Sequence, residues 1–436
     1  MAFQFLVFIL ILFGSSLRLL ESITAASGII IGNEIDQLAL LEFKQQIYDD
    51  PCGVLSSWND SIHFCNWVGI TCGHLHQQRV ISLNLQEKGL GGNISPSIGN
   101  LTFLHSLNIA NNSFHGKIPQ EIGNLFRLQV IYFENNTLGG ELPISLANCT
   151  LLREIHFSNN NLSGKIPVEL FTSSSNLELI SINSNGLTGE IPASIGNISS
   201  VRVISLGVNE LQGSIPESLG QLTNLYALAL HVNNLSGIVP LSIYNISSLQ
   251  LISLVYNQLH GSLPQDIGLT LPNLQQLGFG RNLFSRSIPN SISNISTLQV
   301  IDLDGNNFVG SVPNNLGDLQ NLLLFFMAGN QFGGEAGDLN FLNDLVNCTN
   351  LWLLDLQANG FVGPIPNFKA NLSTQLLQLL LGRNQISGTI PAGIENLVNL
   401  TDLALEGNFL EGNIPSVIGE LSNLQRIYLD ANRLLG

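Results

Sequence analysis

The sequence predicts an α/β repeat solenoid, an elongated superhelix with a long parallel β-sheet on its concave face. Three observations predict it: a frame of residues that returns about every 24 positions, an asparagine at the same place in each frame, and only 11% charged residues beside 44% hydrophobic ones. A single unit of this size cannot bury its own apolar side chains, so repeats must stack to remove them from water. The recurring asparagines are Asn112, Asn136, Asn160, Asn185, Asn209, Asn233, Asn257, Asn282, Asn306, Asn330, Asn359, Asn384, Asn408 and Asn432.

The frame reads L-x-x-L-x-L-x-x-N-x-L-x-G-x-I-P and is clearest from Leu104 to Pro119. Its first six positions alternate apolar and variable residues, which predicts a short strand with one face in the core. The asparagine amide offers donors and an acceptor to backbone groups at the turn that follows. Glycine permits a left-handed backbone and proline prevents a long helix, so short 3₁₀ or irregular convex segments are expected. The frame resembles the plant-type leucine-rich repeat.

The chain divides into three predicted parts. Residues 1–26 are expected to be a secretory signal peptide, because the apolar stretch from Phe3 to Phe13 is short and is followed by small residues. Residues 27–78 are expected to form an N-terminal cap. Residues 79–436 hold about fifteen leucine-rich repeats, of which the last is incomplete.

Composition limits the partners. The formal charge is −16 and the pI is near 4.7, which argues against a nucleic-acid backbone as ligand and leaves basic peptides and proteins. No cofactor or metal is expected. Asp302 with Asp304 is a weak calcium signal, and His105, His156 and His231 are read as surface histidines.

Fourteen sequons favour a glycosylated, secreted protein. Those next to a recurring asparagine fall in the first half of the repeats, so a long ligand would find the later repeats less obstructed. The sequons are Asn59, Asn93, Asn100, Asn111, Asn135, Asn148, Asn161, Asn197, Asn234, Asn245, Asn294, Asn347, Asn371 and Asn399.

The five cysteines have different expected roles. Cys65 and Cys72 stand just before the first repeat, and secretion favours oxidation, so a disulfide is predicted between them. Zinc is the rival interpretation, but no further cysteine or histidine pair completes a four-ligand site. Cys149 and Cys348 are read as small buried hydrophobes. Cys52 has no assigned role.

The region before the repeats resembles the N-terminal cap of plant leucine-rich-repeat receptors. The resemblance is carried by Asp36–Lys44, Leu55–Trp58 and Cys65–Cys72. The resemblance implies a helix that uses Leu38, Leu41 and Phe43 to cover the first repeat.

A long repeat with the segments Phe332–Glu335, Asp338–Leu339, Phe341–Leu342 and Leu345–Thr349 is similar to an insertion in one receptor-like kinase subfamily. That subfamily contains the receptors for bacterial flagellin and elongation-factor peptides.

Departures from the family pattern are informative. Family members continue into a transmembrane helix and a cytoplasmic serine/threonine kinase, whereas this sequence stops at Gly436 with no glycine-rich nucleotide loop, His-Arg-Asp or Asp-Phe-Gly motif. No enzyme activity is therefore expected from this chain, and membrane attachment is expected only through a missing C-terminal helix. Within the repeats, Lys88 replaces the first recurring asparagine and Arg286 replaces a repeat glycine.

The expected function is extracellular recognition of a peptide or protein ligand, as in a plant immune or developmental receptor-like kinase, with a shorter leucine-rich-repeat co-receptor as a second partner. The alternative is a soluble inhibitor of a secreted microbial enzyme such as polygalacturonase. The expected location is the extracellular face of the plasma membrane as a full-length receptor, or the apoplast. The third, fifth and seventh positions of each repeat point out from the concave face. The ligand-binding residues expected there are Asp302, Asp304, Leu324, Phe326, Leu353, Asp355, Leu380, Asp402, Glu406 and Tyr428.

Overall fold

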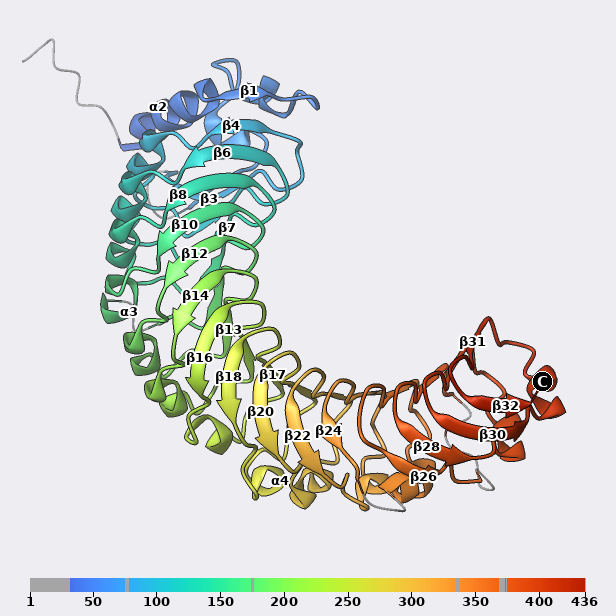
Figure 1. The fold of residues 1–436 in the computed structure, drawn as a ribbon. Helices are drawn as coiled ribbons and strands as arrows, with labels where there is room; N and C mark the ends of the chain where they lie inside the picture. Colours follow the sequence, from blue (N-terminus) through green and yellow to red (C-terminus); the bar gives the residue numbers. More distant parts are fainter. Residues whose placement is uncertain are drawn as a thin grey trace, which may run out of the picture.

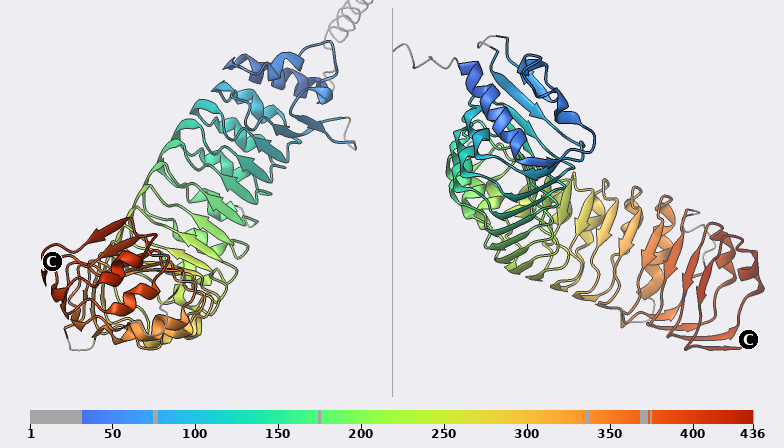
Figure 2. Two further views of the ribbon diagram at one scale, coloured as in Figure 1. Left: turned by 90° about the vertical axis from the view of Figure 1, so that its right-hand side faces the viewer. Right: turned by 90° about the horizontal axis from the view of Figure 1, so that it is seen from above.

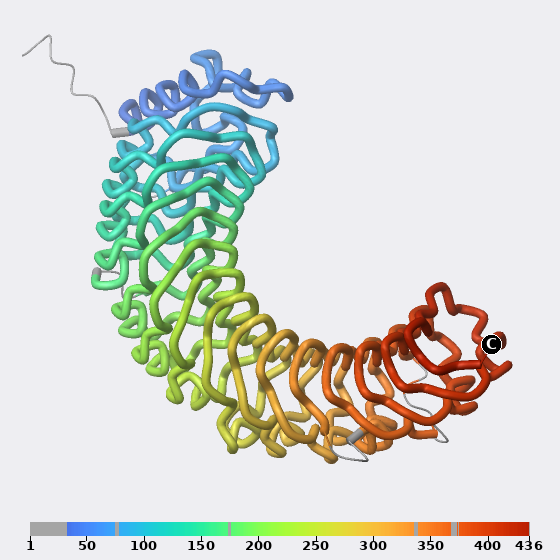
Figure 3. Tube along the Cα trace, viewed as in Figure 1, coloured from blue at the N-terminus to red at the C-terminus, as the bar shows by residue number. Residues whose placement is uncertain are grey.

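The computed structural model describes residues 32–74, 78–173, 176–334, 338–367, 373 and 375–435. The chain forms a curved solenoid with the N-terminal cap at one end and the last repeats at the other (Figure 1, Figure 3). Two further views show the same separation of the two ends (Figure 2). The predicted signal peptide of residues 1–26 and the sequon at Asn371 lie outside the described residues.

A 16-stranded sheet runs along the inner side of the curve, and we call it the concave sheet. Each repeat contributes the strand that the L-x-x-L-x-L alternation predicts, and neighbouring strands pair in parallel except at the cap, where β2 pairs antiparallel with β3. Its strands are β2 (Ile70–Cys72), β3 (Val80–Asn84), β5 (Ser106–Asn108), β7 (Val130–Tyr132), β9 (Glu154–His156), β11 (Leu179–Ser181), β13 (Val203–Ser205), β15 (Ala227–Ala229), β17 (Leu251–Ser253), β19 (Gln276–Gly278), β21 (Val300–Asp302), β23 (Leu324–Phe326), β25 (Leu353–Asp355), β27 (Gln378–Leu380), β29 (Asp402–Ala404) and β31 (Arg426–Tyr428).

A second sheet follows the asparagine of each repeat, and the sequence analysis did not predict it. We call it the lateral sheet. It has 12 strands and is succeeded by a separate four-stranded sheet. The twelve are β1 (Ile47–Asp49), β4 (Gly91–Asn93), β6 (Ser113–Lys117), β8 (Thr137–Glu141), β10 (Asn161–Lys165), β12 (Gly186–Gly189), β14 (Glu210–Gly213), β16 (Asn234–Ile238), β18 (Gln258–Gly261), β20 (Leu283–Arg286), β22 (Asn307–Gly310) and β24 (Gln331–Phe332). The four are β26 (Val362–Pro364), β28 (Gln385–Gly388), β30 (Phe409–Asn413) and β32 (Arg433–Leu435).

Short helices line the convex side, as the glycine and proline pattern predicts. Most are 3₁₀ helices, and two are single turns of α-helix, α3 (Glu169–Ser173) and α4 (Ile267–Thr270). The repeat proline often sits directly before the helix, where its missing N–H leaves no hydrogen bond unmade. The 3₁₀ helices are η3 (Pro96–Asn100), η4 (Gln120–Asn124), η5 (Ile144–Asn148), η6 (Ala193–Asn197), η7 (Glu217–Gln221), η8 (Ile243–Asn245), η9 (Asn290–Asn294), η10 (Leu316–Asp318), η11 (Asp338–Asn347), η12 (Ala392–Asn396) and η13 (Ser416–Glu420).

The recurring asparagines join one repeat to the next. The Asn160 amide nitrogen donates to the carbonyl of Phe133 in the preceding repeat at 2.9 Å and to that of Phe157 in its own repeat at 3.2 Å. Its oxygen accepts from the backbone N–H of Leu138 at 3.0 Å. These bonds pair backbone groups that the two sheets leave unpaired, so the predicted structural role is confirmed. Asn112 accepts the equivalent bond from the backbone N–H of Leu90 at 2.9 Å and a further one from the backbone N–H of Lys88 at 3.1 Å, so the first repeat is still joined to the second although it has a lysine in place of its asparagine.

Stacked phenylalanines fill the core between the sheets in the later repeats. The rings of Phe284, Phe308, Phe332 and Phe361 follow one another at centroid distances of 6.4, 6.0 and 6.5 Å. All four side chains are buried. The stack passes through the long repeat, while the lateral sheet stops at β24 and resumes at β26.

The cap covers the first repeat with helix α2 (Gly32–Gln45). The buried side chains of α2 are Asp36, Ala39, Leu40 and Phe43, a spacing of one helical face. The expectation that Leu38 belongs to this face is wrong, because its side chain is 52% exposed, and Leu41 is only half-buried. Position 38 lies on the opposite side of the helix from position 36, where the buried group is a carboxylate that the apolar pattern did not reveal.

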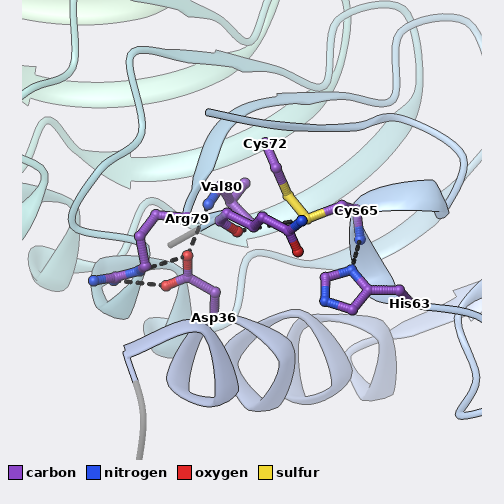
Figure 4. Close-up of a disulfide and its surroundings, with 7 residues drawn as sticks. Asp36, His63, Cys65, Cys72, Arg79 and Val80 are labelled. Carbon is purple, nitrogen blue, oxygen red and sulfur yellow. Dashed lines mark hydrogen bonds and ion pairs between the residues drawn. A yellow bond between two sulfur atoms is a disulfide. The ribbon is translucent and has the colours of Figure 1, made fainter. Parts of the chain in front are cut away.

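The predicted disulfide between Cys65 and Cys72 is confirmed, with Cα atoms 5.5 Å apart (Figure 4). It joins η2 (Phe64–Asn66) to β2, the strand that begins the concave sheet. Next to it, η1 (Val54–Ser57) leads to Trp58, whose indole N–H donates to the carbonyl of Val68 at 3.0 Å. Cys149 and Cys348 are buried free thiols, as predicted, and Cys52 is an exposed free thiol.

Candidate functional site

The concave sheet arranges its outward side chains in rows, because each strand pairs in register with the next. One row contains Asp302, Phe326, Asp355 and Leu380 on strands β21, β23, β25 and β27. The sequence analysis predicted all four as ligand-binding residues, and the register makes them consecutive neighbours. Phe326 therefore lies between two aspartates.

Both aspartates of this row are half-buried. Burial raises the pKa of Asp302 to about 6. The backbone N–H of Asp304 donates to Asp302 Oδ1 at 3.1 Å, and this hydrogen bond partly offsets the rise in pKa. Burial likewise raises the pKa of Asp355 to about 6, although the backbone N–H of Gln357 donates to its Oδ1 at 3.1 Å. The charge of Arg281 opposes the rise in the pKa of both carboxylates, but among the described residues Arg281 forms its ion pair with Asp304 and not with Asp302 or Asp355. A cation placed over Phe326 would meet both.

The other predicted carboxylates differ in whether another residue of the chain already pairs with them. Asp402 is only 4% exposed and already forms an ion pair with Arg426, and it accepts a hydrogen bond from Thr401 Oγ1 at 2.8 Å. Burial alone would raise the pKa of Asp402, but the bonds from Arg426, Thr401 and Gln378 outweigh it and lower the pKa. Asp402 is thus neutralised within the chain and is not free for a ligand.

Asp304 and Glu406 lie in the neighbouring row, and each keeps one carboxylate oxygen that accepts no hydrogen bond from the described residues. Arg281 approaches Asp304 Oδ2 at 3.6 Å, a long contact that leaves Oδ1 without a hydrogen bond in the described part of the chain. Burial raises the pKa of Asp304, and Arg281 opposes this. Glu406 accepts only a long bond from Gln357 at 3.5 Å, and its Oε2 is buried without a partner among the described residues.

These side chains border a hollow of about 820 Å³ on the concave face of the last repeats. It brings together Asp304, Leu380, Asp402, Glu406 and Tyr428 of the predicted set. Leu324, Phe326, Leu353, Asp302 and Asp355 lie on the same sheet but are not among the residues that line it. The lining is Arg281, Asp304, Gly305, Ala328, Gly329, Gln357, Ala358, Gln378, Leu380, Arg383, Asp402, Ala404, Glu406, Arg426, Tyr428 and Asp430.

The apolar members of the predicted set are less exposed than expected. Phe326, Leu324, Leu353 and Leu380 are half-buried, because side chains on adjacent strands pack against one another. Tyr428 is exposed on the last described strand of the concave sheet. The apolar patch is therefore a shallow floor and not a set of projecting anchors.

The repeat pattern did not reveal two arginines of the hollow. Arg281 and Arg383 occupy the eighth position of their repeats, one residue past the three positions taken to face outward, with left-handed φ values of 55° and 57°. That turn carries their side chains to the rim of the hollow. The available signal was the eighth position itself, which reads Arg281, Gly305, Gly329, Ala358 and Arg383 in five successive repeats.

Other candidate sites are weaker. His156 and His231 are half-buried and not fully solvated as expected. His156 Nε2 lies 3.1 Å from Glu154 Oε2, and burial lowers the pKa of His231. Within the described ranges no three His, Cys, Asp or Glu side chains gather closely enough to hold a metal ion. The described residues also include no helix with the length and apolar character needed to cross a bilayer.

The sequon asparagines that the structure describes are exposed or half-buried. Six of them end a convex 3₁₀ helix, namely Asn100, Asn148, Asn197, Asn245, Asn294 and Asn347. Three others lie on the lateral sheet, at Asn93, Asn161 and Asn234. Asn111 and Asn135 lie at the turn between the sheets, where the Asn135 amide donates to the oxygen of Asn111 at 2.6 Å.

Comparisons with known proteins agree with this architecture. Residues 33–73 match the leucine-rich-repeat N-terminal domain, and residues 103–125, 127–149, 151–172, 176–198 and 297–319 match the leucine-rich repeat. The receptor-like serine/threonine-protein kinase EFR of Arabidopsis thaliana is 50% identical over 91 residues, which are 21% of this chain and 9% of that protein. The receptor kinase-like protein Xa21 of Oryza sativa is 47% identical over 74 residues, 16% of this chain and 7% of that protein. The matched stretch thus spans less than a tenth of either relative.

Solved structures match over much more of the chain. The crystal structure of a TDR receptor aligns with 82% of this chain and 64% of its own, at a TM-score of 0.72 and 28% identity. The Arabidopsis receptor kinase HAESA, solved with the peptide hormone IDA and the co-receptor SERK1, aligns with 92% of this chain and 82% of its own, at a TM-score of 0.60 and 26% identity. The chain thus carries a leucine-rich-repeat N-terminal domain and leucine-rich repeats, and its fold is similar to the ectodomains of plant receptor kinases.

Proposed function

We propose that this chain is the extracellular ligand-recognition domain of a plant receptor-like kinase, and that its ligand is a peptide or protein segment carrying a basic side chain. The observation that carries the proposal is the row Asp302–Phe326–Asp355, in which an aromatic ring is bordered by two carboxylates that form no ion pair among the described residues. An arginine side chain fits such a place, because its guanidinium stacks on aromatic rings and donates to carboxylates.

The hollow beside the row extends the proposed contact. A ligand that continues from Phe326 toward the last repeats reaches Arg383 and Glu406, whereas Arg281 lies in the opposite direction, two repeats before Phe326. Mixed charge along this path favours a ligand with both basic and acidic groups, and the net charge of −16 favours an overall basic one. The likeness to a receptor solved with a peptide hormone and a co-receptor supports two partners, a peptide and a shorter leucine-rich-repeat protein.

The proposal includes the cellular setting. The expected signal peptide, the sequons and the disulfide all favour passage through the secretory pathway to the extracellular face of the plasma membrane. Recognition and not catalysis is the proposed role of these residues. An immune role and a developmental role are both compatible with the site.

The test uses matched peptide pairs. A panel of basic peptides is screened against the secreted chain by surface plasmon resonance, and each binding peptide is remade with citrulline, the uncharged analogue, in place of each arginine. One citrulline should weaken binding at least tenfold in the wild type. The same exchange should have little effect in the double variant Asp302→Asn/Asp355→Asn, because this variant lacks the two carboxylates that bind the positive charge.

A convex substitution supplies the control. Glu217→Gln removes a carboxylate from η7, away from the concave sheet, and should bind as the wild type does. The proposal fails if citrulline lowers the affinity of the double variant as much as that of the wild type. It also fails if substitution of Glu217 weakens binding and substitution of Phe326 does not.

A further inference from the structure

Arg286 stands where the repeat frame places a glycine. The equivalent residues in the neighbouring repeats are Gly261 and Gly310, whose φ values are 111° and 83°. Arg286 keeps the same left-handed backbone, with φ of 70°. Residues with a Cβ atom are disfavoured there, so this repeat retains a strained arginine where glycine would relieve the strain.

The fold makes no evident use of the Arg286 side chain. Arg79, Arg153 and Arg426 each form an ion pair with a carboxylate. Arg286 is exposed, and no carboxylate or aromatic ring contacts it in the part of the chain that the structure describes. Strain without an internal contact is typical of a residue kept for function and not for stability.

The strands around Arg286 carry no other permanently charged side chain, and their one further titratable group is the exposed His260 on β18. Strands β18, β20, β22 and β24 contain no lysine, aspartate, glutamate or other arginine. Earlier strands of the same sheet carry Lys117, Glu141 and Lys165. A single cation thus stands in an uncharged region of an acidic chain.

Two exposed apolar side chains lie on either side of this cation. Leu283, three residues before Arg286 on β20, is 52% exposed, and Val309 on the adjacent strand β22 is 40% exposed. The two strands pair through Ser285 and Asn307, so all three side chains belong to one continuous surface. Exposed apolar residues around a central charge are typical of protein interfaces.

Sequon positions separate this surface from the rest of the lateral sheet. Sequons occur on β4, β10 and β16, at Asn93, Asn161 and Asn234. From β18 to β24 the strands contain none. Attached glycans would cover the earlier strands and leave this stretch open.

We propose that strands β18–β24 form a docking surface for a partner protein that presents a carboxylate to Arg286 and apolar side chains to Leu283 and Val309. Charge complementarity selects the carboxylate, because Arg286 is the one lysine or arginine on these four described strands and they contain no carboxylate. The surface belongs to the lateral sheet, so a partner there leaves the concave row around Phe326 open. The proposal therefore stands or falls independently of the concave ligand site.

Site-directed photo-cross-linking tests the proposal in the full secreted chain. Cys52→Ser removes the exposed thiol, and Ser287→Cys then places a benzophenone maleimide beside Arg286. Ser214→Cys is the matched control, because Ser214 holds the same repeat position next to β14. After irradiation with membranes from plant cells, mass spectrometry should find a partner peptide that contains aspartate or glutamate and is cross-linked to the probe on residue 287. The probe on residue 214 should give no such peptide.

Charge exchange then tests the contact itself. Arg286→Glu should lower the cross-linked yield at least tenfold, and replacing the identified partner carboxylate with lysine should restore it. Equal yields at positions 287 and 214, absence of any adduct at 287, or a yield indifferent to Arg286→Glu would each overturn the proposal.

Three further variants separate docking from folding. Arg286→Gly should lose the adduct and melt no lower than the wild type, since glycine relieves the left-handed strain; a lower melting temperature would make Arg286 structural. Leu283→Asn completes a sequon with Ser285 and leaves the probe at position 287 in place, and its glycan should block the adduct. Gln212→Asn, which completes a sequon with Ser214 on the earlier part of the sheet, should leave the adduct at 287 unchanged.

Discussion

Arg79 donates two hydrogen bonds to the carboxylate of Asp36, at 2.9 Å from Nε and 2.7 Å from Nη2, and so ties helix α2 to the start of β3 (Figure 4). The backbone N–H of Val80 donates to the same carboxylate at 2.8 Å. Asp36 is fully buried. An unpaired buried charge is costly, so this pair makes the cap and the first repeat depend on each other.

We predict that Asp36→Ala destabilises the cap and first repeats by about 3 kcal/mol, because it leaves the Arg79 guanidinium unpaired beside the core. Hydrogen exchange of the amides in β3 and β5 measures the loss. The matched control is Arg153→Gln, which breaks the solvent-exposed pair with Glu178 and should cost less than about 1 kcal/mol. Similar losses in the two variants would show that the buried pair has no special role.

Breaking the disulfide should have a larger effect than removing a buried thiol. Cys65→Ser opens a short ring that contributes roughly 2–3 kcal/mol in the loop-entropy model. Cys149→Ser replaces one buried sulfur atom with oxygen, at a thiol that lies 3.4 Å from the carbonyl oxygen of Ile122. We expect Cys65→Ser to lower the secreted yield and the melting temperature more than Cys149→Ser does. Equal losses would contradict this.

The recurring asparagines should matter more than their direct neighbours. Asn330 is buried and bonds the carbonyls of Leu303 and Met327 at 2.9 and 3.1 Å, while its oxygen accepts from Phe308 N–H at 3.0 Å. Asn330→Ala should cost at least about 2 kcal/mol, because several backbone groups lose their partners. Asn307→Ala, on the exposed face of β22, should cost less than about 0.5 kcal/mol. Chemical denaturation of the secreted chain compares the two.

The sequence predicts the repeat path well because each repeat restates the same local chemistry. The strand, the asparagine and the convex helix follow from periodicity, a turn residue and a proline, and all three are visible in any one repeat. The lateral sheet was missed because its outward residues, such as Asn161 and Ser163, have weak strand preference. Neighbouring repeats supply the pairing that the residues themselves do not favour.

The concave site was predicted only in part. Position within the repeat identified Asp302, Phe326 and Asp355, and the register then placed them side by side. It did not reveal that Arg426 neutralises Asp402, because that contact joins two repeats whose sequences do not show the pairing. Burial of Asp36 was missed for the same reason, since its partner Arg79 lies in another element.

The buried aspartates should make stability depend on pH. The folded pKa values of Asp302 and Asp355 are about 6, above the usual value of 3.8, so the folded chain binds more protons than the unfolded one between those limits. These groups therefore lower the free energy of unfolding as pH rises from about 4 to 6. Asp302→Asn/Asp355→Asn should flatten this fall and be more stable than the wild type at pH 7. An unchanged slope in denaturation curves at pH 4, 5, 6 and 7 would contradict it.

Ligand binding should show the opposite pH dependence. A cationic ligand binds the carboxylate forms of Asp302 and Asp355, and these forms become predominant as pH rises through about 6. Affinity for an arginine-containing peptide should increase from pH 5 to pH 7 and release protons on binding. Isothermal titration in buffers of different ionisation enthalpy measures that release. The citrulline analogue is the control and should bind equally at both pH values.

Finally, the apolar and charged parts of the site should affect different rate constants. Phe326 packs in the sheet between two strands, so Phe326→Ala removes short-range contact and should accelerate dissociation by about 30-fold, equivalent to roughly 2 kcal/mol, with little change in the association rate. Asp304→Asn and Glu406→Gln remove long-range attraction and should slow association and weaken its dependence on salt. Surface plasmon resonance at two ionic strengths separates the effects. Faster dissociation from the charge variants with unchanged association would show that these carboxylates contact the ligand directly and do not steer it.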